Sequence, residues 1–117
     1  SLHAIAEISR DLAERARTNR LTPDDYRGGT FTVSNLGMLG VKEFIAILNP
    51  PQAGILALGE AAPRAVVRDG SIVASTQMTA TLSADHRVVD GAVGAAFLKA
   101  FRSSIEQPNR LFEDEST

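Results

Sequence analysis

The segment from Ala53 to Gly59, which reads AGILALG, is apolar at every position. A strand with one face in solvent alternates apolar and polar residues, whereas an unbroken apolar run of this length is typical of a strand buried on both faces. Asn49, Pro50 and Pro51 stand just before this run, and two successive prolines do not fit inside a helix or a strand ladder. The pattern therefore predicts a short interior strand with other parts of the protein on both sides.

Two further segments show the period of an amphipathic helix. The first begins at residue 2 and is predicted to end near Asn19. Its apolar stripe consists of Leu2, Ile5, Ile8, Leu12 and Ala16. The second runs from 93 to 105, with Asp90 as its expected N-cap and Pro108 marking its end. Its apolar stripe consists of Val93, Phe97, Leu98, Phe101 and Ile105.

Further strands are predicted from β-branched and aromatic residues and from turn signals. Residues 30–34 form one, and 76–82 form another that leads into His86. Asp69 and Gly70 separate two β-prone runs, which is the strongest short signal for a hairpin. The apolar segment 44–48 fits a strand or a short helix. Helices and strands of these kinds together indicate an α/β (α+β) fold.

Composition narrows the class of protein. A length of 117 residues suits one domain or part of one, and folding alone would bury roughly 65 % of the unfolded surface. A net charge of −2 argues against a nucleic-acid partner. The absence of cysteine excludes disulfides, thiolate metal sites and a cysteine nucleophile. No apolar run approaches the length of a membrane span. The first residues already follow a helical pattern and lack an initial Met, so a fragment or processed piece is expected.

His86 stands between the strand 76–82 and the helix that follows, which is a common place for catalytic groups. Imidazole titrates near neutrality, so His86 is the candidate general base. Asp90 follows four residues later and is a candidate for ordering the site, either through Arg87 or through the His86 loop. The alternatives are a structural or surface role for His86, and a helix cap alone for Asp90.

Three segments carry a resemblance to a known family: GGTFTVSNLG at 28–37, NPPQAGILALG at 49–59 and DHRVVDGA at 85–92. In this order they resemble motifs of the dihydrolipoamide acyltransferases, the core components of 2-oxo acid dehydrogenase complexes. That family is related to chloramphenicol acetyltransferase. The resemblance covers residues 1–117 as the C-terminal half of the catalytic domain, hence a partial domain. It implies a chloramphenicol acetyltransferase-like fold, with a mixed sheet flanked by helices, and a homotrimer that builds a larger core.

The resemblance also implies the chemistry, which is transfer of an acyl group between a lipoyl thiol and coenzyme A without a metal. The NPPQA form of the second motif favours acetyl as that group. His86 matches the general base, and Ser34 matches a hydroxyl that stabilises the oxyanion, serving the His86 of a neighbouring subunit. Asn35 is a candidate substrate contact, with loop formation as the alternative. On residue type alone, Thr30 or Thr32 would compete with Ser34.

Partners and location follow from the same resemblance. The decarboxylase and dihydrolipoamide dehydrogenase components would bind through parts absent from this chain, and neither a nucleic acid nor a membrane is expected as a partner. Leu111 and Phe112 are candidates for contacts between trimers, and residues 113–117 for a solvated tail. The expected location is the bacterial cytoplasm, or the mitochondrial matrix or plastid in a eukaryote.

Three alternative functions stay open. A non-catalytic structural subunit of such a core would keep the fold and lose the histidine, which this chain retains as His86. A chloramphenicol acetyltransferase-type enzyme would use a hydroxyl acceptor, but the motifs at 28–37 and 49–59 favour the dehydrogenase-core family. A branched-chain or succinyl acyltransferase of a sister complex is the third alternative.

Overall fold

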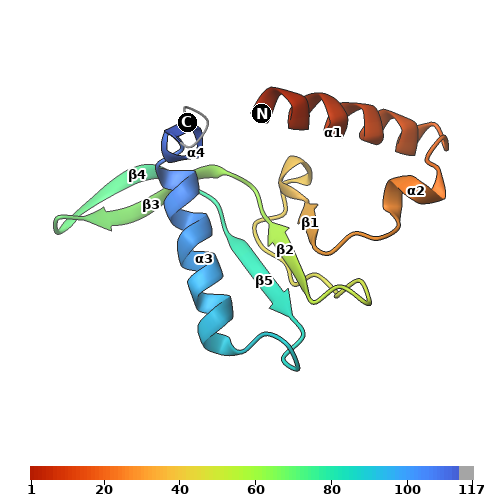
Figure 1. The fold of residues 1–117 in the computed structure, drawn as a ribbon. Helices are drawn as coiled ribbons and strands as arrows, with labels where there is room; N and C mark the ends of the chain where they lie inside the picture. The colour runs from red at the N-terminus through yellow and green to blue at the C-terminus, as the bar shows by residue number, and fades with distance from the viewer. Residues whose placement is uncertain (114–117) are drawn as a thin grey trace.

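The computed structural model describes residues 1–113 of the chain (Figure 1). In chain order the elements are α1 (Leu2–Arg17), α2 (Pro23–Tyr26), β1 (Thr32–Asn35), the 3-10 helix η1 (Gly37–Leu39), β2 (Gly54–Leu58), β3 (Ala62–Arg68), β4 (Ser71–Gln77), β5 (Ala80–Ala84), α3 (Gly91–Glu106) and α4 (Arg110–Glu113). Of the tail that the sequence predicts to be solvated, residues 114–117 lie outside the described part.

The strand predicted from the AGILALG run is β2, the middle strand of a three-stranded sheet in the order β1-β2-β5. It runs parallel to β1 and antiparallel to β5, so the sheet is mixed, as the family resemblance implies. The four residues from Gly54 to Ala57 are buried, and Ala57 retains only 1 % of its exposure. The prediction of an interior strand is confirmed, because β2 has a bonded neighbour on each edge and cover on both faces.

The two faces of this sheet differ in chemistry. Residues in register point to the same face, and successive residues alternate. Val33, Leu56 and Leu82 form one row, and this side faces α3, because a Cβ on Gly94 would lie 3.6 Å from the Leu82 side chain. We call it the α3 face. The opposite side, here called the hydroxyl face, carries Thr32, Ser34, Ile55, Ala57, Thr81 and Ser83.

Both predicted helices form, and local caps explain where they begin. The Ser1 hydroxyl accepts a hydrogen bond from the Ala4 N–H at the start of α1. α1 is tied to α2 by an ion pair in which the Arg15 guanidinium lies 2.6 Å from the Asp25 carboxylate. The Arg15 guanidinium also donates hydrogen bonds to both Asp25 oxygens. These bonds, with a smaller contribution from Thr22, hold the pKa of Asp25 well below its ordinary range. α3 begins after Asp90 and ends at Glu106, shortly before Pro108.

Two strand predictions are wrong in part. The stretch 76–82 is not one strand: it breaks at Met78 and Thr79, because β4 pairs with β3 in a separate hairpin whereas β5 pairs with β2. The segment 44–48 forms neither a strand nor a helix. Its residues alternate between half-buried and exposed, with Ile45 and Ile47 in solvent, so the backbone is extended but has no strand beside it within residues 1–113.

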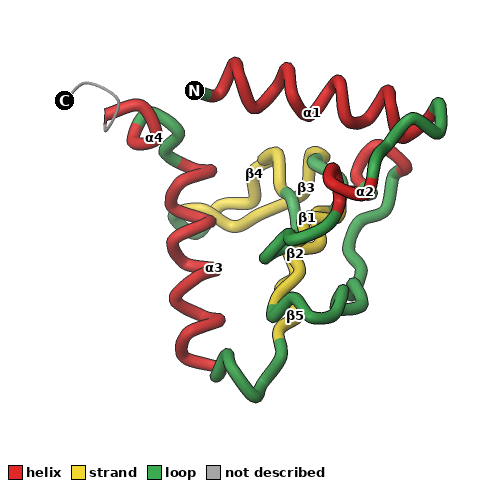
Figure 2. The backbone as a smooth tube through the Cα atoms, turned by 45° about the vertical axis from the view of Figure 1, so that its right-hand side comes forward, coloured by secondary structure: helices red, strands yellow, loops and turns green. Residues whose placement is uncertain are grey.

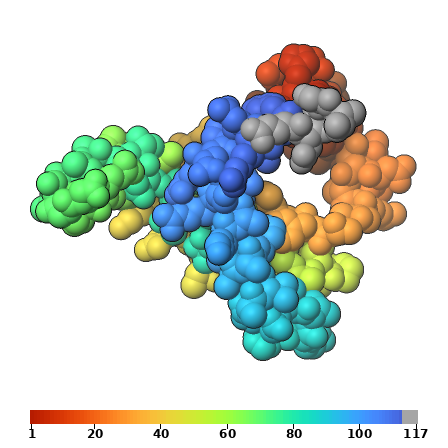
Figure 3. Space-filling model, turned by 60° about the vertical axis from the view of Figure 1, so that its left-hand side comes forward, coloured from red at the N-terminus to blue at the C-terminus, as the bar shows by residue number. Residues whose placement is uncertain are grey.

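The chain exposes far more surface than a folded monomer of its size. Its accessible area is 9262 Å², against about 6,200 Å² expected for its mass. Its radius of gyration is 16.8 Å, against about 13.4 Å expected for its length. The expectation of roughly 65 % burial is therefore wrong, and the value is about half. The reason is visible in Figures 2 and 3, where α1 lies apart from the sheet and the β3–β4 hairpin stands out as an arm.

Candidate active site

His86 lies on the turn that connects the sheet to α3. Just before it, the Asp85 N–H still donates to the Ala53 carbonyl at 2.8 Å, so the ladder between β2 and β5 continues up to the turn. His86 itself is exposed and borders an open cleft of about 340 Å³ on the α3 face. The cleft is also lined by Leu82, Ala84, Asp90, Gly94 and Leu98. The predicted place of His86, between a strand and a helix, is confirmed.

Asp90 caps the helix that follows His86. One of its carboxylate oxygens accepts a hydrogen bond of 2.8 Å from the Val93 N–H, which satisfies a free donor in the first turn of α3. The suggested pairing of Asp90 with Arg87 is not what the structure shows. Arg87 instead pairs with Asp85, its guanidinium lying 2.7 Å from the Asp85 carboxylate. Asp90 accepts the capping hydrogen bond of α3, and Asp85 accepts both the Arg87 guanidinium and the Arg87 N–H.

Asp85 is the most strongly perturbed acid on this turn. Side-chain hydrogen bonds from Arg87, followed by the bond from the Arg87 backbone N–H, lower the pKa of Asp85 from 3.8 to about 2. Asp85 therefore remains charged throughout the neutral range. No role for Asp85 was predicted from the sequence, although an aspartate that accepts from the N–H two residues on is a common turn-forming arrangement.

Ser34 and His86 of one chain lie on opposite sides of the sheet. Ser34 is half-buried on the hydroxyl face, in register with Ala57, while the cleft of His86 opens on the α3 face. The backbone of β2 stands between them. The structure therefore brings His86 and Asp90 to one cleft and leaves Ser34 outside it.

Two other candidate residues, Asn35 and Thr32, have hydrogen-bond partners in or near β1. The Asn35 side-chain oxygen accepts a hydrogen bond of 2.9 Å from the Gly37 N–H, so it helps to form the loop that ends β1. The Thr32 hydroxyl donates to the side-chain oxygen of Gln52. Gln52 was part of a motif in the sequence but received no role there. It lies beside the hydroxyl face because Thr32 belongs to that face.

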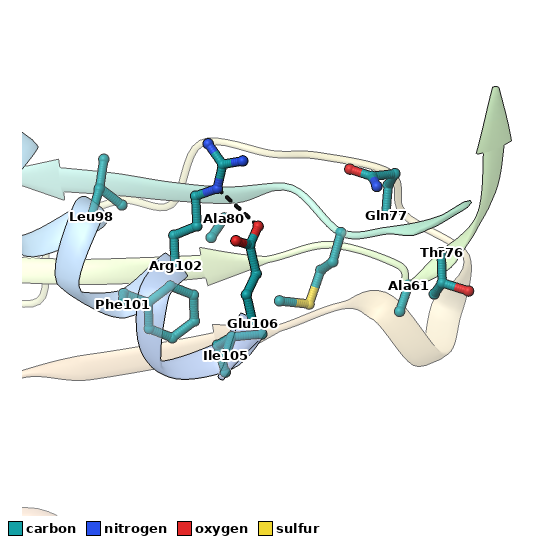
Figure 4. Close-up of a pocket in the computed structure, with 10 residues that line it drawn as sticks. Ala61, Thr76, Gln77, Ala80, Leu98, Phe101, Arg102, Ile105 and Glu106 are labelled. Carbon is teal, nitrogen blue, oxygen red and sulfur yellow. Dashed lines mark hydrogen bonds and ion pairs between the residues drawn. The ribbon is translucent and has the colours of Figure 1, made fainter. Parts of the chain in front are cut away.

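A larger groove, of about 440 Å³, lies elsewhere along α3 (Figure 4). Leu98, Phe101 and Ile105 of α3 form its apolar wall, opposite residues at the base of the β3–β4 hairpin. The pair Arg102–Glu106, with 2.9 Å between the guanidinium and the carboxylate, stands at its edge. The described lining contains no histidine and no serine. The cleft at His86 is therefore the candidate active site, although it is the smaller of the two.

Within residues 1–113, no group of three or more histidine, aspartate or glutamate side chains is arranged to hold a metal ion. Over the same part of the chain, no helix has both the length and the apolar character needed to cross a membrane.

The arrangement agrees with comparisons to known proteins. The model of the 2-oxoacid dehydrogenases acyltransferase catalytic domain matches residues 1–113. This chain belongs to that family. Its relatives include acetyltransferase components of pyruvate dehydrogenase complexes. The resemblance noted from the three sequence motifs is thereby confirmed.

Among these relatives, the dihydrolipoyllysine-residue acetyltransferase component of the pyruvate dehydrogenase complex of Rickettsia felis is 54 % identical over 107 residues. That alignment covers 89 % of this chain and 26 % of the relative. The corresponding component of Rhizobium meliloti is 53 % identical over 108 residues, covering 92 % and 24 %. The mitochondrial component 2 of Arabidopsis thaliana is 52 % identical, covering 94 % and 21 %. The chain thus spans about a quarter of the length of these relatives.

Solved acyltransferase structures confirm the predicted fold class. The dihydrolipoamide acetyltransferase of Azotobacter vinelandii has a TM-score of 0.90 and 33 % identity, covering 96 % of this chain and 46 % of that one. A cubic core of the pyruvate dehydrogenase multienzyme complex has a TM-score of 0.90 and 32 % identity, with the same coverage. The Azotobacter study concerns the roles of a serine, a histidine and an asparagine in catalysis. That serine precedes the histidine by 52 positions, and the asparagine follows the histidine by 4.

Proposed function

We propose that this sequence carries the general base of a dihydrolipoyllysine-residue acetyltransferase, which moves an acetyl group between a lipoyl thiol and coenzyme A. One observation carries the proposal. Ser34, His86 and Asp90 have the same spacings as the serine, histidine and asparagine studied in the Azotobacter enzyme, and His86 stands exposed at a cleft. The names of the close relatives support acetyl as the group transferred.

The proposed role of His86 follows from the chemistry of thiols. A thiol with a pKa of about 8.5 is mostly protonated at neutral pH, and the thiolate is the nucleophile. His86 removes the proton from the thiol of coenzyme A, and the sulfur attacks the thioester carbonyl of the acetylated lipoyl group. The tetrahedral intermediate then expels the lipoyl sulfur, which takes the proton back from His86. The substrate is already an activated thioester, so this sequence of steps needs no metal.

Ser34 is proposed to donate a hydrogen bond to the oxyanion of that intermediate. Its position on the hydroxyl face, with the sheet between it and the cleft of its own His86, supports a site completed by the Ser34 of a second chain. Asp90 is proposed to order the site by fixing the start of α3. Asn35 is proposed as a substrate contact through its amide nitrogen, because its oxygen is engaged in the loop.

The proposed assembly is a homotrimer that builds a larger core, in keeping with the cubic core of a structural relative. The decarboxylase and dihydrolipoamide dehydrogenase components are proposed partners of the complete protein. Leu111 and Phe112, which are 50 % and 47 % exposed, are proposed contacts between trimers. The proposed location is the bacterial cytoplasm. Mitochondrial relatives make the matrix the counterpart in eukaryotes.

The test measures acetyl transfer from acetyl-coenzyme A to dihydrolipoamide by the full-length, assembled protein. His86→Ala is expected to lower the rate by about 10²-fold or more, the usual contribution of a general base. His3→Ala is the matched control, since His3 lies on α1 with an 85 % exposed side chain paired to Glu7, and its rate should equal that of the wild type.

Two results would contradict the proposal. If the folded, assembled wild type transfers nothing, the structural-subunit alternative replaces it. If succinyl- or isobutyryl-coenzyme A is a faster donor than acetyl-coenzyme A, the acyl group is wrong and the chain belongs to a sister complex.

A further inference from the structure

Asp85 joins three sets of hydrogen bonds immediately before His86. Its N–H donates to Ala53 at 2.8 Å, which ties it to the central strand β2. Its carbonyl accepts from the N–H groups of Val88 and Val89, at 3.0 and 2.9 Å, and closes the turn. Its carboxylate accepts from the Arg87 N–H at 3.0 Å. Every polar group of Asp85 is therefore used to shape the backbone on either side of His86.

The Arg87 guanidinium completes this arrangement. It donates to both oxygens of the Asp85 carboxylate, from Nε at 3.0 and 3.1 Å and from a terminal nitrogen at 2.7 Å. The Asp85 side chain is 22 % exposed, whereas that of Arg87 is 88 % exposed. An ion pair with one partner so exposed adds little to folding stability. Its geometric effect is larger, because the two residues that flank His86 are bound to each other.

His86 has no such anchor of its own. Among the described residues, no hydrogen bond or ion pair to its imidazole is present, and the side chain is exposed. Its placement at the cleft therefore depends on the backbone that carries it. Catalysis is sensitive to such placement, since a displacement of about 1 Å costs on the order of 10²-fold in rate.

We propose that Asp85 is a positioning residue for His86, holding the turn in the conformation that presents the imidazole to the cleft, with Arg87 as its clamp. The proposal rests on the proposed function of His86 and concerns a residue that does not itself touch the substrates. The low pKa of Asp85 agrees with it, because the carboxylate that accepts these hydrogen bonds is charged at neutral pH.

The chain offers a graded set of variants for the test. Asp85→Ala removes the carboxylate, and with it both the bond from the Arg87 N–H and the clamp. Asp85→Asn keeps an oxygen for the Arg87 N–H but removes the charge. Arg87→Met removes the clamp alone. Asp69→Asn, at the far tip of the β3–β4 hairpin, is the matched acidic control.

The kinetic experiment compares these variants in the full-length, assembled protein, with and without His86→Ala. Asp85→Ala is expected to lower kcat by about 30- to 100-fold, with smaller losses for Asp85→Asn and Arg87→Met. KM for both substrates should change less than about twofold. Asp85 does not contact the substrates, and KM changes alone only when an interaction made equally in the ground state and the transition state is lost. Asp69→Asn should match the wild type. In the His86→Ala background, Asp85→Ala should cost nothing further, since it acts through the imidazole.

A second readout is independent of activity. Hydrogen exchange at the Arg87 amide should become faster in Asp85→Ala and stay close to wild type in Asp85→Asn. The proposal is overturned by unchanged exchange in Asp85→Ala, by a wild-type kcat in that variant, or by an equal loss in the His86→Ala background. If Asp85→Ala does not assemble, Asp85→Asn and Arg87→Met test the proposal in the same comparison, each measured with and without His86→Ala. If His86→Ala retains the wild-type rate, the proposed function fails. The hydrogen-exchange result then tests by itself whether Asp85 holds the turn around His86.

Discussion

At the scale of single residues, position decides what identical side chains do. The chain has two histidines. His3 faces solvent on α1 beside Glu7, and His86 occupies a turn at the rim of a cleft. The hydroxyls of β1 differ in a similar way. Thr32 and Ser34 share the hydroxyl face, but the Thr32 proton is committed to Gln52. Of these two β1 hydroxyls, Ser34 is therefore better suited to donate to an oxyanion.

This comparison makes Ser34→Ala a test of the oxyanion role. The variant is expected to lower kcat by about 10²- to 10³-fold with little change in KM, because one oxyanion donor is lost. Thr32→Val should cost much less, since its hydroxyl already serves Gln52. Steady-state kinetics of the assembled protein measures both. A larger loss for Thr32→Val than for Ser34→Ala would transfer the role to Thr32.

The lowered pKa of Asp85 also makes the free energy of unfolding depend on pH. Its pKa falls from 3.8 to about 2 on folding, so its contribution to stability is complete above pH 4 and disappears as the pH falls toward 2. The difference in free energy of unfolding between wild type and Asp85→Asn should be constant from pH 7 to 5 and shrink below pH 4. Denaturant titrations at several pH values measure it. A difference that grows with acidity would contradict the assigned bonds.

At the scale of elements, β2 organises the molecule. Both β1 and β5 are hydrogen-bonded to it. The buried hydrophobic residues of the described chain are its Ile55, Leu56 and Ala57. Gly59, directly after it, is also buried and packs against the backbone of the segment 41–49. That segment has no regular structure, so close packing against Gly59 is part of what holds it on the sheet.

Gly59→Ala is expected to destabilise the protein by about 1–3 kcal/mol, the usual cost of overpacking. A Cβ at this position would lie 1.9 Å from the Lys42 carbonyl oxygen, and a backbone atom has little freedom to move away. Gly91→Ala is the control, since a Cβ there meets nothing within 4 Å. Thermal unfolding of the two variants measures the effect. Equal midpoints would mean that the segment 41–49 gives way at little cost.

At the scale of the whole molecule, the described chain leaves much of its apolar surface exposed. It exposes 9262 Å², roughly half again the area of a folded monomer of its mass. Large apolar side chains on α1 and on the β3–β4 hairpin remain in solvent, among them Ile8, Val67 and Ile72. Ser34 and His86 face opposite ways. All three features agree with the proposed assembly, in which one site combines residues of two chains.

A subunit-mixing experiment tests this arrangement. Ser34→Ala and His86→Ala chains are each inactive by the proposal, but co-assembled in equal amounts they should recover activity. Random mixing in a cyclic trimer whose sites join two chains restores about one quarter of the sites. Co-expression followed by the acetyl-transfer assay measures it, with separately assembled variants mixed afterwards as the control. Recovery no greater than in that control would mean that each chain supplies both residues to one site.

Local signals in the sequence were enough for α1, α3, β2 and the β3–β4 hairpin. Helical period, an aspartate cap, an unbroken apolar run and an Asp-Gly turn all act between residues close in the chain. The place of His86, between strand and helix, followed from the same signals. Where a prediction of this kind was wrong, as with the single strand over 76–82, the competing factor was pairing with a distant strand.

Only the tertiary structure decided what depends on such distant partners. It split 76–82 between two sheets and left 44–48 extended without a strand beside it. It paired Arg87 with Asp85 and committed Asp90 to α3. Above all, it set Ser34 and His86 on opposite faces of one sheet. A strand's period of two says that its faces differ, but which face meets which helix depends on register and packing across the fold.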